Sequence, residues 1–306
     1  MADFRHKCTT EDEGMEVKDV MKKYFDFSSR LRNRIKREDL LRLNDEHTQG
    51  WHRVKSGDVL SVVLPDEKSN FEPQNIPLNI VYEDEDIILI NKQPGLIVHP
   101  TKGHPNGTVA NALMYRMQET GDEFKIRFVN RLDMDTSGLL IVARNSYSQN
   151  DITSQMRKNM VHKKYIAILN GIIEEDEGVV DAPIGRPDPV DVRRGVMPDG
   201  APSVTHYSVL ERFRDSRYRS RTDAGFTLVE LVLETGRTHQ IRVHMSHIGH
   251  PVLGDYLYGG DNVLLIERQA LHAAELDFSH PISKAPVHAD AELPSDMQEA
   301  LDKLRG

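Results

Sequence analysis

Two segments of the chain hold charged residues in patterns that could catalyse a reaction. Residues 131–138 read Arg-Leu-Asp-Met-Asp-Thr-Ser-Gly, and residues 236–244 read Gly-Arg-Thr-His-Gln-Ile-Arg-Val-His. Asp133 offers a carboxylate that is anionic at neutral pH without a separate base, because its unperturbed pKa is near 3.9. If this group is buried, a nearby cation would keep it ionised. Three arginines are candidates for that cation: Arg131, Arg237 and Arg242. The pattern indicates an enzyme that uses an aspartate and no cofactor.

Other interpretations of these segments also fit their residues. Asp, Thr, Ser and Gly directly before the apolar run 139–143 are typical of a β-turn with incidental charges. Asp133 and Asp135 could instead be the acid/base pair of a glycosidase, although a spacing of two residues on a turn does not define their separation. The histidines nearby are irregularly spaced and lack an HExxH element or a cysteine pair, so we expect no metal site. These histidines are His239, His244, His247 and His250.

The composition predicts a soluble cytoplasmic protein. The chain has 306 residues, of which 38% are hydrophobic and 28% charged, and this length suffices for two domains. The single cysteine, Cys8, can form no disulfide within the chain, which fits a reducing compartment. The N-terminus lacks the apolar core of a signal peptide, and no stretch approaches the roughly 18 apolar residues of a membrane span. We therefore expect a monomer in the cytoplasm, without a membrane partner.

The charge distribution favours a local binding surface for phosphate. The net charge is −9, but residues 18–55 contain eleven Lys or Arg and only six Asp or Glu. Because screening limits the reach of distant charges to about 10 Å, a basic face can bind nucleic acid on an acidic protein. The alternative is an ordinary solvated helix face. The densest group comprises Arg30, Arg32, Arg34, Lys36 and Arg37.

The order of patterns along the chain predicts a small module followed by a larger domain. We expect a disordered acidic tail over 1–14, a module over 15–65 and a proline-rich linker over 66–77. In residues 78–306, strands and helices do not alternate regularly, which favours a mixed, largely antiparallel α+β domain over a parallel doubly wound sheet. Helices are expected at 108–119, 145–159, 238–247 and 296–304, and strands at 139–143, 165–169, 204–213 and 226–234.

Five segments of the chain resemble the motifs of one enzyme family in the family's own order. Residues 131–138 resemble the Arg-Leu-Asp-x-x-Thr-Ser-Gly signature of the RluA/RluD family of pseudouridine synthases. In the strand-and-turn motif at 86–100, Gln93 is an extra residue between Lys92 and Pro94. The module at 15–65 resembles the alpha-L RNA-binding module that often precedes this catalytic domain. The remaining matches are 163–171, 235–250 and the pair 254–258 and 271–281.

The resemblance implies a role for each candidate residue. Asp133 is implied as the catalytic aspartate and Arg242 as the arginine that pairs with it. Tyr165 is implied to stack on a uracil that has been flipped out of its helix, and Arg131 to fill the vacated space or bind a phosphate. Further RNA contacts are expected from Lys163, Lys164, Arg237 and His239.

The implied substrate is a uridine in structured RNA. Ribosomal RNA of the large subunit is expected, with transfer RNA as the other candidate. Two rival functions use the same residues differently: a non-catalytic RNA-binding protein that retains the fold, and a carboxylate-dependent nucleosidase that would release free base or sugar.

Overall fold

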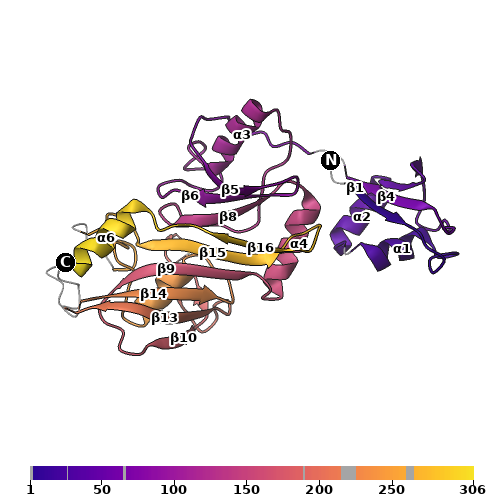
Figure 1. Cartoon of the computed structure of the whole chain (residues 1–306). Helices are drawn as coiled ribbons and strands as arrows, with labels where there is room; N and C mark the ends of the chain where they lie inside the picture. Colours follow the sequence, from indigo (N-terminus) through magenta and orange to yellow (C-terminus); the bar gives the residue numbers. More distant parts are fainter. Residues whose placement is uncertain (1–2, 26, 65–66, 189, 215–224, 260–264) are drawn as a thin grey trace.

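The chain folds around one ten-stranded sheet, with a smaller four-stranded module beside it (Figure 1). The computed structural model describes residues 3–25, 27–64, 67–188, 190–214, 225–259 and 265–306. The expected mixed, largely antiparallel α+β fold is confirmed. Within the described residues, the large sheet has one parallel pair, between β8 (Ser137–Ala143) and β15 (Leu271–Ser279).

The N-terminal module packs two helices on a sheet of strand order β1-β4-β2-β3. Its second helix begins after Ser28, whose hydroxyl accepts a hydrogen bond of 3.2 Å from the amide of Leu31, as expected for a helix cap. Leu31 and Ile35, four residues apart, lie buried on one face of this helix. The elements are β1 (Asp3–Lys7), α1 (Val17–Tyr24), α2 (Ser29–Arg37), β2 (Leu41–Leu43), β3 (Glu46–His47) and β4 (Val59–Val63).

The prediction of a disordered tail over residues 1–14 is wrong from Asp3 onward. β1 is an edge strand of the module and pairs antiparallel with β4, with Asp3 opposite Val63. Cys8 is buried directly after β1, and Asp12 has no exposed surface. The Asp12 carboxylate accepts hydrogen bonds from backbone, hydroxyl and ammonium donors. Backbone pairing and a satisfied buried carboxylate therefore outweigh the acidic composition on which the prediction rested.

An aromatic cluster joins the module to the large domain. Tyr147, on α4 (Ser146–Arg157) of the large domain, belongs to the hydrophobic core of the module. Its ring centroid lies 4.6 Å from that of Phe4 and 5.6 Å from that of Phe27. Figure 1 shows the module beside α4, at the opposite end of the molecule from α6 (Ser295–Arg305).

The predicted linker over 66–77 also holds the two parts together. Glu67 pairs with Arg34 of α2 and, at 2.7 Å, with Arg127 of β7 (Arg127–Phe128). Phe71 and Ile76 pack against the hydrophobic core of the large domain. The described part of this segment is therefore attached along its length to the surface of the large domain.

The large sheet runs in the order β10-β13-β14-β9-β15-β8-β6-β5, with β16 on β15 and β7 on β8. The expected helices and strands are present within two residues of most predicted bounds. The elements not yet given are β5 (Asn79–Glu83), β6 (Ile87–Lys92), α3 (Val109–Thr120), β9 (His162–Asn170), β10 (Glu177–Asp181), β11 (Ile184–Gly185), β12 (Gly195–Val196), β13 (Val204–Phe213), β14 (Phe226–Leu233), α5 (Gln240–His247) and β16 (Pro286–Asp290).

Helices cover both faces of the sheet around β6 and β8, which explains the continuous apolar runs of these strands. Ile88 and Ile90 face α3 and share its hydrophobic core, whereas Ile87 and Leu89 face the core that contains Ile152 of α4. Alternate side chains of one strand therefore serve two cores. This double burial fixes β8, and with it the aspartate segment that immediately precedes the strand.

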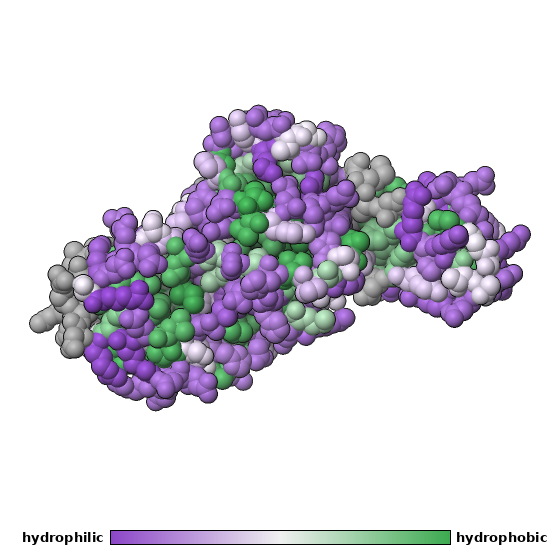
Figure 2. Space-filling view, viewed as in Figure 1, coloured by the Kyte–Doolittle hydropathy of each residue, from purple (hydrophilic) through white to green (hydrophobic). Residues whose placement is uncertain are grey.

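The outer surface is mostly hydrophilic. Figure 2 shows purple, hydrophilic residues over most of one face, interrupted by green apolar patches on the large domain. Among the described residues, no helix is both long and apolar enough to cross a membrane.

Gly138 permits the close approach of β8 to β15. Its φ of 109° lies in the region that favours glycine, and a Cβ at this position would lie 2.6 Å from the amide nitrogen of Ala273 and closer still to its carbonyl oxygen. The two halves of the sheet meet at this pair, directly beyond the aspartate segment.

We therefore predict that Gly138→Ala lowers the free energy of unfolding by about 3 kcal/mol or more, because strands must separate to admit a methyl group. Denaturant unfolding measures the loss. Gly121→Ala is the matched control, since Gly121 also has positive φ (74°) but nothing within 4 Å of its Cβ position. The control should lose about 1 kcal/mol from backbone strain alone. Equal losses would show that the contact with Ala273 is not the cause.

Candidate active site

Asp133 lines a cleft of about 1040 Å³. The aspartate segment before β8, Lys163 and Tyr165 of β9, and the segment between β14 and α5 all contribute to its lining. Three parts of the chain that are distant in sequence thus meet because β8, β15, β9 and β14 are neighbours in the sheet. The cleft is wide enough for a nucleotide, since ligand pockets are typically about 300–1,000 Å³.

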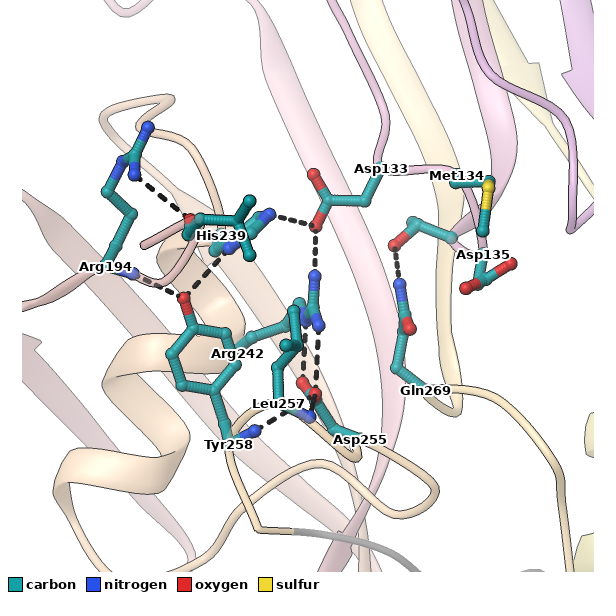
Figure 3. Close-up of polar contacts among 12 residues, drawn as sticks. Asp133, Met134, Asp135, Arg194, His239, Arg242, Asp255, Leu257, Tyr258 and Gln269 are labelled. Carbon is teal, nitrogen blue, oxygen red and sulfur yellow. Dashed lines mark hydrogen bonds and ion pairs between the residues drawn. The ribbon is translucent and has the colours of Figure 1, made fainter. Parts of the chain in front are cut away.

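Arg242 connects two carboxylates in this cleft (Figure 3). Its Nη1 donates to Oδ2 of Asp133 at 2.9 Å. Its Nε and Nη2 donate to the two carboxylate oxygens of Asp255 at 2.6 and 2.9 Å. The guanidinium thus forms a bidentate ion pair with Asp255 and donates its remaining hydrogen bond, from Nη1, to Asp133. The expected contact between Arg242 and Asp133 is present.

The two carboxylates that contact Arg242 keep its guanidinium charged. Burial opposes the charge, because only 3% of Arg242 is exposed, but the carboxylates of Asp255 and Asp133 outweigh burial and raise its pKa above the ordinary value. Oδ2 of Asp133 is engaged by the guanidinium, whereas Oδ1 has no hydrogen-bond partner within the described residues. The Asp133 side chain is 20% exposed and lines the cleft, where its carboxylate can act as a nucleophile or a base.

His239 and Tyr258 form a second set of contacts around Asp133. Nδ1 of His239 lies 2.9 Å from the hydroxyl oxygen of Tyr258, which also accepts a 2.8 Å hydrogen bond from the amide of Arg194. In the tautomer in which the Tyr258 hydroxyl donates to Nδ1, the imidazole carries its proton on Nε2. Nε2 lies 3.8 Å from Oδ2 of Asp133. Burial, reinforced by Arg242 and Arg194, lowers the pKa of His239, so the ring is neutral at pH 7.

Tyr165 and Lys163 point into the cleft, whereas Lys164 does not. Successive side chains of β9 alternate between the faces of the sheet, so positions 163 and 165 share the cleft side. Burial, and secondly the charge of Asp133, raise the pKa of Tyr165, which therefore remains a phenol. Lys164 pairs with Glu230 at 3.3 Å and Glu275 at 3.0 Å and does not line the cleft. The prediction of an RNA contact at Lys164 is not supported by its position.

Lys92 anchors the aspartate segment to β6. This side chain has no exposed surface, and its Nζ donates to the carbonyl oxygens of Gln93, Leu96 and Met134 at 2.9, 2.9 and 2.8 Å. Since Met134 follows Asp133, the ammonium fixes the backbone next to the carboxylate. Burial lowers the pKa of Lys92 to about 7, against the opposing influence of Asp135 and Asp133.

The other predicted site residues fall into two groups. Arg131, Arg237 and His239 line the cleft, and the first two are exposed there. The basic residues of α2 lie on the module and divide by their contacts. Arg34 is occupied by Glu38 and Glu67, and Arg32 donates to the carbonyl oxygen of Phe27. Charge counting therefore overestimated this face; its exposed members are Arg30, Lys36 and Arg37.

Potential metal ligands gather at three places in the described part of the chain, all outside the cleft lining. Each group already has partners within the protein; Asp12, for example, accepts from the ammonium of Lys23 at 2.9 Å. The expectation of no metal or cofactor stays a prediction. The groups are His6, Cys8 and Asp12; Asp84, Asp86 and His280; and Glu275, Asp277 and His288.

Sequence reasoning missed three residues that support the site: Lys92, Asp255 and Tyr258. Asp255 and Tyr258 stand in the segment 254–258, which was recognised as a family motif without roles for its members. Their acidic and phenolic groups, close in sequence to the arginine-containing helix, were the available signal. Lys92 offered a weaker one: a lysine at the end of an apolar strand is ordinarily solvent-exposed.

Comparisons with known proteins agree with this geometry. A family described as RNA pseudouridylate synthase matches residues 86–247. The ribosomal large subunit pseudouridine synthase D of Haemophilus ducreyi is 40% identical over 299 residues, which cover 91% of this chain and 88% of that protein. YjbO of Bacillus subtilis, an uncharacterized RNA pseudouridine synthase, is 41% identical over 264 residues, covering 85% and 89%. The structure of human RNA pseudouridylate synthase domain containing 4 has a TM-score of 0.58 and 27% identity, covering 74% of this chain and 93% of that one.

The chain therefore belongs to the RNA pseudouridylate synthase family, and the expected RluA/RluD-type membership is confirmed. It is an isomerase that converts uridine to pseudouridine in RNA. The reaction exchanges the bond from ribose to uracil N1 for a bond to C5, without loss of base or sugar.

We predict that Asp255→Asn destabilises the protein and lowers its activity together. Removal of one carboxylate leaves the buried guanidinium of Arg242 undercompensated, which typically costs about 3–5 kcal/mol. Unfolding in denaturant and the initial rate of pseudouridine formation measure the two effects. The control is Glu211→Gln, which breaks an exposed pair with Arg305 (2.7 Å) and should cost less than about 1 kcal/mol. A similar, small loss in both variants would contradict the proposed dependence on Asp255.

A second prediction concerns pH and Lys92. The ordinary lysine pKa of 10.5 applies in the unfolded chain and about 7 in the native one, so between these values the unfolded state binds more protons. Stability contributed by this position must then rise with pH. Relative to Lys92→Met, the native chain should gain about 2 kcal/mol between pH 7 and pH 9. Denaturant unfolding at both pH values tests this; parallel pH profiles would contradict it.

Proposed function

We propose that this enzyme modifies uridine in ribosomal RNA of the large subunit, in the cytoplasm, as a monomer and without a cofactor. Support for this target comes from the 40% identity over most of both chains to a synthase named for the large ribosomal subunit. YjbO is as similar and its name specifies no RNA, so transfer RNA is the alternative substrate to be tested.

Asp133 is the proposed catalytic residue. The proposal rests on one observation: Arg242 holds Oδ2 of an aspartate whose side chain lines the cleft. Three routes use such a group: addition to the base, attack on the ribose, or removal of a ribose proton. Each requires a carboxylate held beside the glycosidic bond, and the buried guanidinium of Arg242 orients the carboxylate of Asp133 through a direct hydrogen bond.

The walls of the cleft supply the remaining proposed contacts. The ring of Tyr165, buried except for 8% of its surface, is placed to stack on the flipped uracil. Arg131 and Arg237 are exposed cations that line the cleft, and we propose that they bind phosphates next to the target. His239 and Lys163 are proposed to contact the nucleotide itself.

The two rival functions make weaker use of this geometry. A carboxylate-dependent nucleosidase would need a positioned water to release the base, and an RNA-binding protein would have no use for a buried ion triad. Family membership favours the isomerase over both. The rivals predict free uracil, or no chemical change, when RNA is incubated with the enzyme.

We predict that Asp133→Asn lowers the rate of pseudouridine formation by about a thousandfold or more while the protein remains folded, because Asn lacks the charge. The assay is release of tritium from RNA labelled at uracil C5. Asp135→Asn removes a carboxylate from the same segment and should retain activity within about tenfold. Full activity of Asp133→Asn would overturn the assignment.

The target is identified by mapping pseudouridine in ribosomal and transfer RNA from cells that lack this gene. The site should return when the intact gene is restored and stay unmodified with Asp133→Asn. Loss of a pseudouridine from transfer RNA alone would contradict the ribosomal target without affecting the assigned chemistry.

A further inference from the structure

Three of the side chains that line the cleft are apolar and exposed to solvent. Tyr256 is 65% exposed, Val192 60% and Met134 40%, and all three line the same cleft as Asp133. Exposed hydrophobic residues scattered singly over a protein need no explanation. Three that share one substrate cleft form a contact surface, which we call the cleft rim.

Tyr256 is displayed from a rigid turn. Asp255, directly before it, is fully buried, and one of its carboxylate oxygens accepts hydrogen bonds from the amides of Leu257 (3.1 Å) and Tyr258 (3.3 Å). The same carboxylate grips Arg242. The backbone on both sides of Tyr256 is thereby fixed to the catalytic ion network, so a ligand that contacts the ring encounters a preorganised surface.

The depth of Tyr256 distinguishes it from Tyr165. Tyr165 is 8% exposed and lies beside Asp133, where the reacting uracil must reach the carboxylate. Tyr256 is eight times more exposed than Tyr165 and lines the same cleft, so its ring is open to a second group of the substrate.

The chemistry of base flipping suggests which group that is. Extruding a uridine removes the stacking partner of each neighbouring base, and an exposed aromatic ring replaces such a partner without regard to base identity. Aliphatic side chains such as Val192 and Met134 pack on the edges of a stacked base. Polar side chains on the rim would instead favour a phosphate, as at Arg131 and Arg237.

We propose that the cleft rim, with Tyr256 as its platform, binds a nucleobase next to the target uridine. This rests on the proposed function in that the ligand is RNA with a flipped uridine. The rim then supplies affinity and alignment at one flanking position, while chemistry takes place at Asp133. A protein partner covering the same surface is the competing outcome of the test.

The experiment combines a protein change with an RNA change. A synthetic stem-loop RNA with one loop uridine is prepared intact, and with the nucleotide on either side of that uridine replaced by an abasic one. Both proteins carry Asp133→Asn so that no turnover occurs, and this single variant is the reference. The dissociation constant is measured for the reference and for the same chain with Tyr256→Ala added. With intact RNA, Tyr256→Ala should weaken binding between about 5-fold and 100-fold, the range expected for loss of one stacked base.

The abasic RNA identifies the ligand. One of the two abasic substitutions should weaken binding of the reference by a similar factor, and Tyr256→Ala should cause little further loss on that RNA. Tyr256→Phe keeps the ring and should bind like the reference. Leu210→Ala is the control, because Leu210 is 52% exposed on β13 and lies outside the cleft lining.

Several results would overturn the proposal. Unchanged binding by Tyr256→Ala, or equal losses on intact and both abasic RNAs, would show that no base stacks on this ring. Loss of self-association or of a protein complex in place of RNA affinity would assign the rim to a protein partner. Because binding is measured without turnover, the effect of Tyr256→Ala on RNA affinity can be interpreted even if no pseudouridine is formed. Absence of pseudouridine formation would count only against the proposed target.

Discussion

The site depends on one buried cation held between two carboxylates. A guanidinium with 3% exposure is costly unless it is paired, and Asp255 pairs it with both oxygens before any substrate is present. Its third contact, to Asp133, is the only one that reaches the cleft. Folding therefore fixes the orientation of the proposed catalytic carboxylate, so RNA binding is not required to orient it.

The sheet places the three parts of this network within reach of each other. β8 and β15 run parallel at the centre, where the two halves of the sheet meet, and the aspartate segment enters directly before that pair. β9 lies on the other side of β15, and α5 follows β14 one strand further. Gly138 makes this joint possible, because any larger residue would collide with the backbone of Ala273.

The sequence predicted the elements well, and the site residues that it proposed lie together in one cleft, because both leave local signals. Alternating or continuous apolar runs gave β13, β14 and β8, and the family motifs gave Asp133, Arg242 and Tyr165. Long-range pairings leave no such signal. Besides the local partner Glu38, Arg34 pairs with Glu67, more than thirty positions away, and Lys164 pairs with acids from two other strands. A charge count predicts exposure for such residues, whereas tertiary contacts decide which cations remain free for RNA.

The same reasoning explains why Asp255 and Lys92 had to be found in three dimensions. Neither contacts substrate in the proposed arrangement; each fixes a residue that does, one through a guanidinium and the other through the backbone carbonyl of Met134. Groups of this kind stabilise a reacting geometry in advance, so the free energy of RNA binding is not spent on ordering the site. Exposed cations and exposed apolar side chains line the same cleft, and these are the groups for which we propose contacts with RNA.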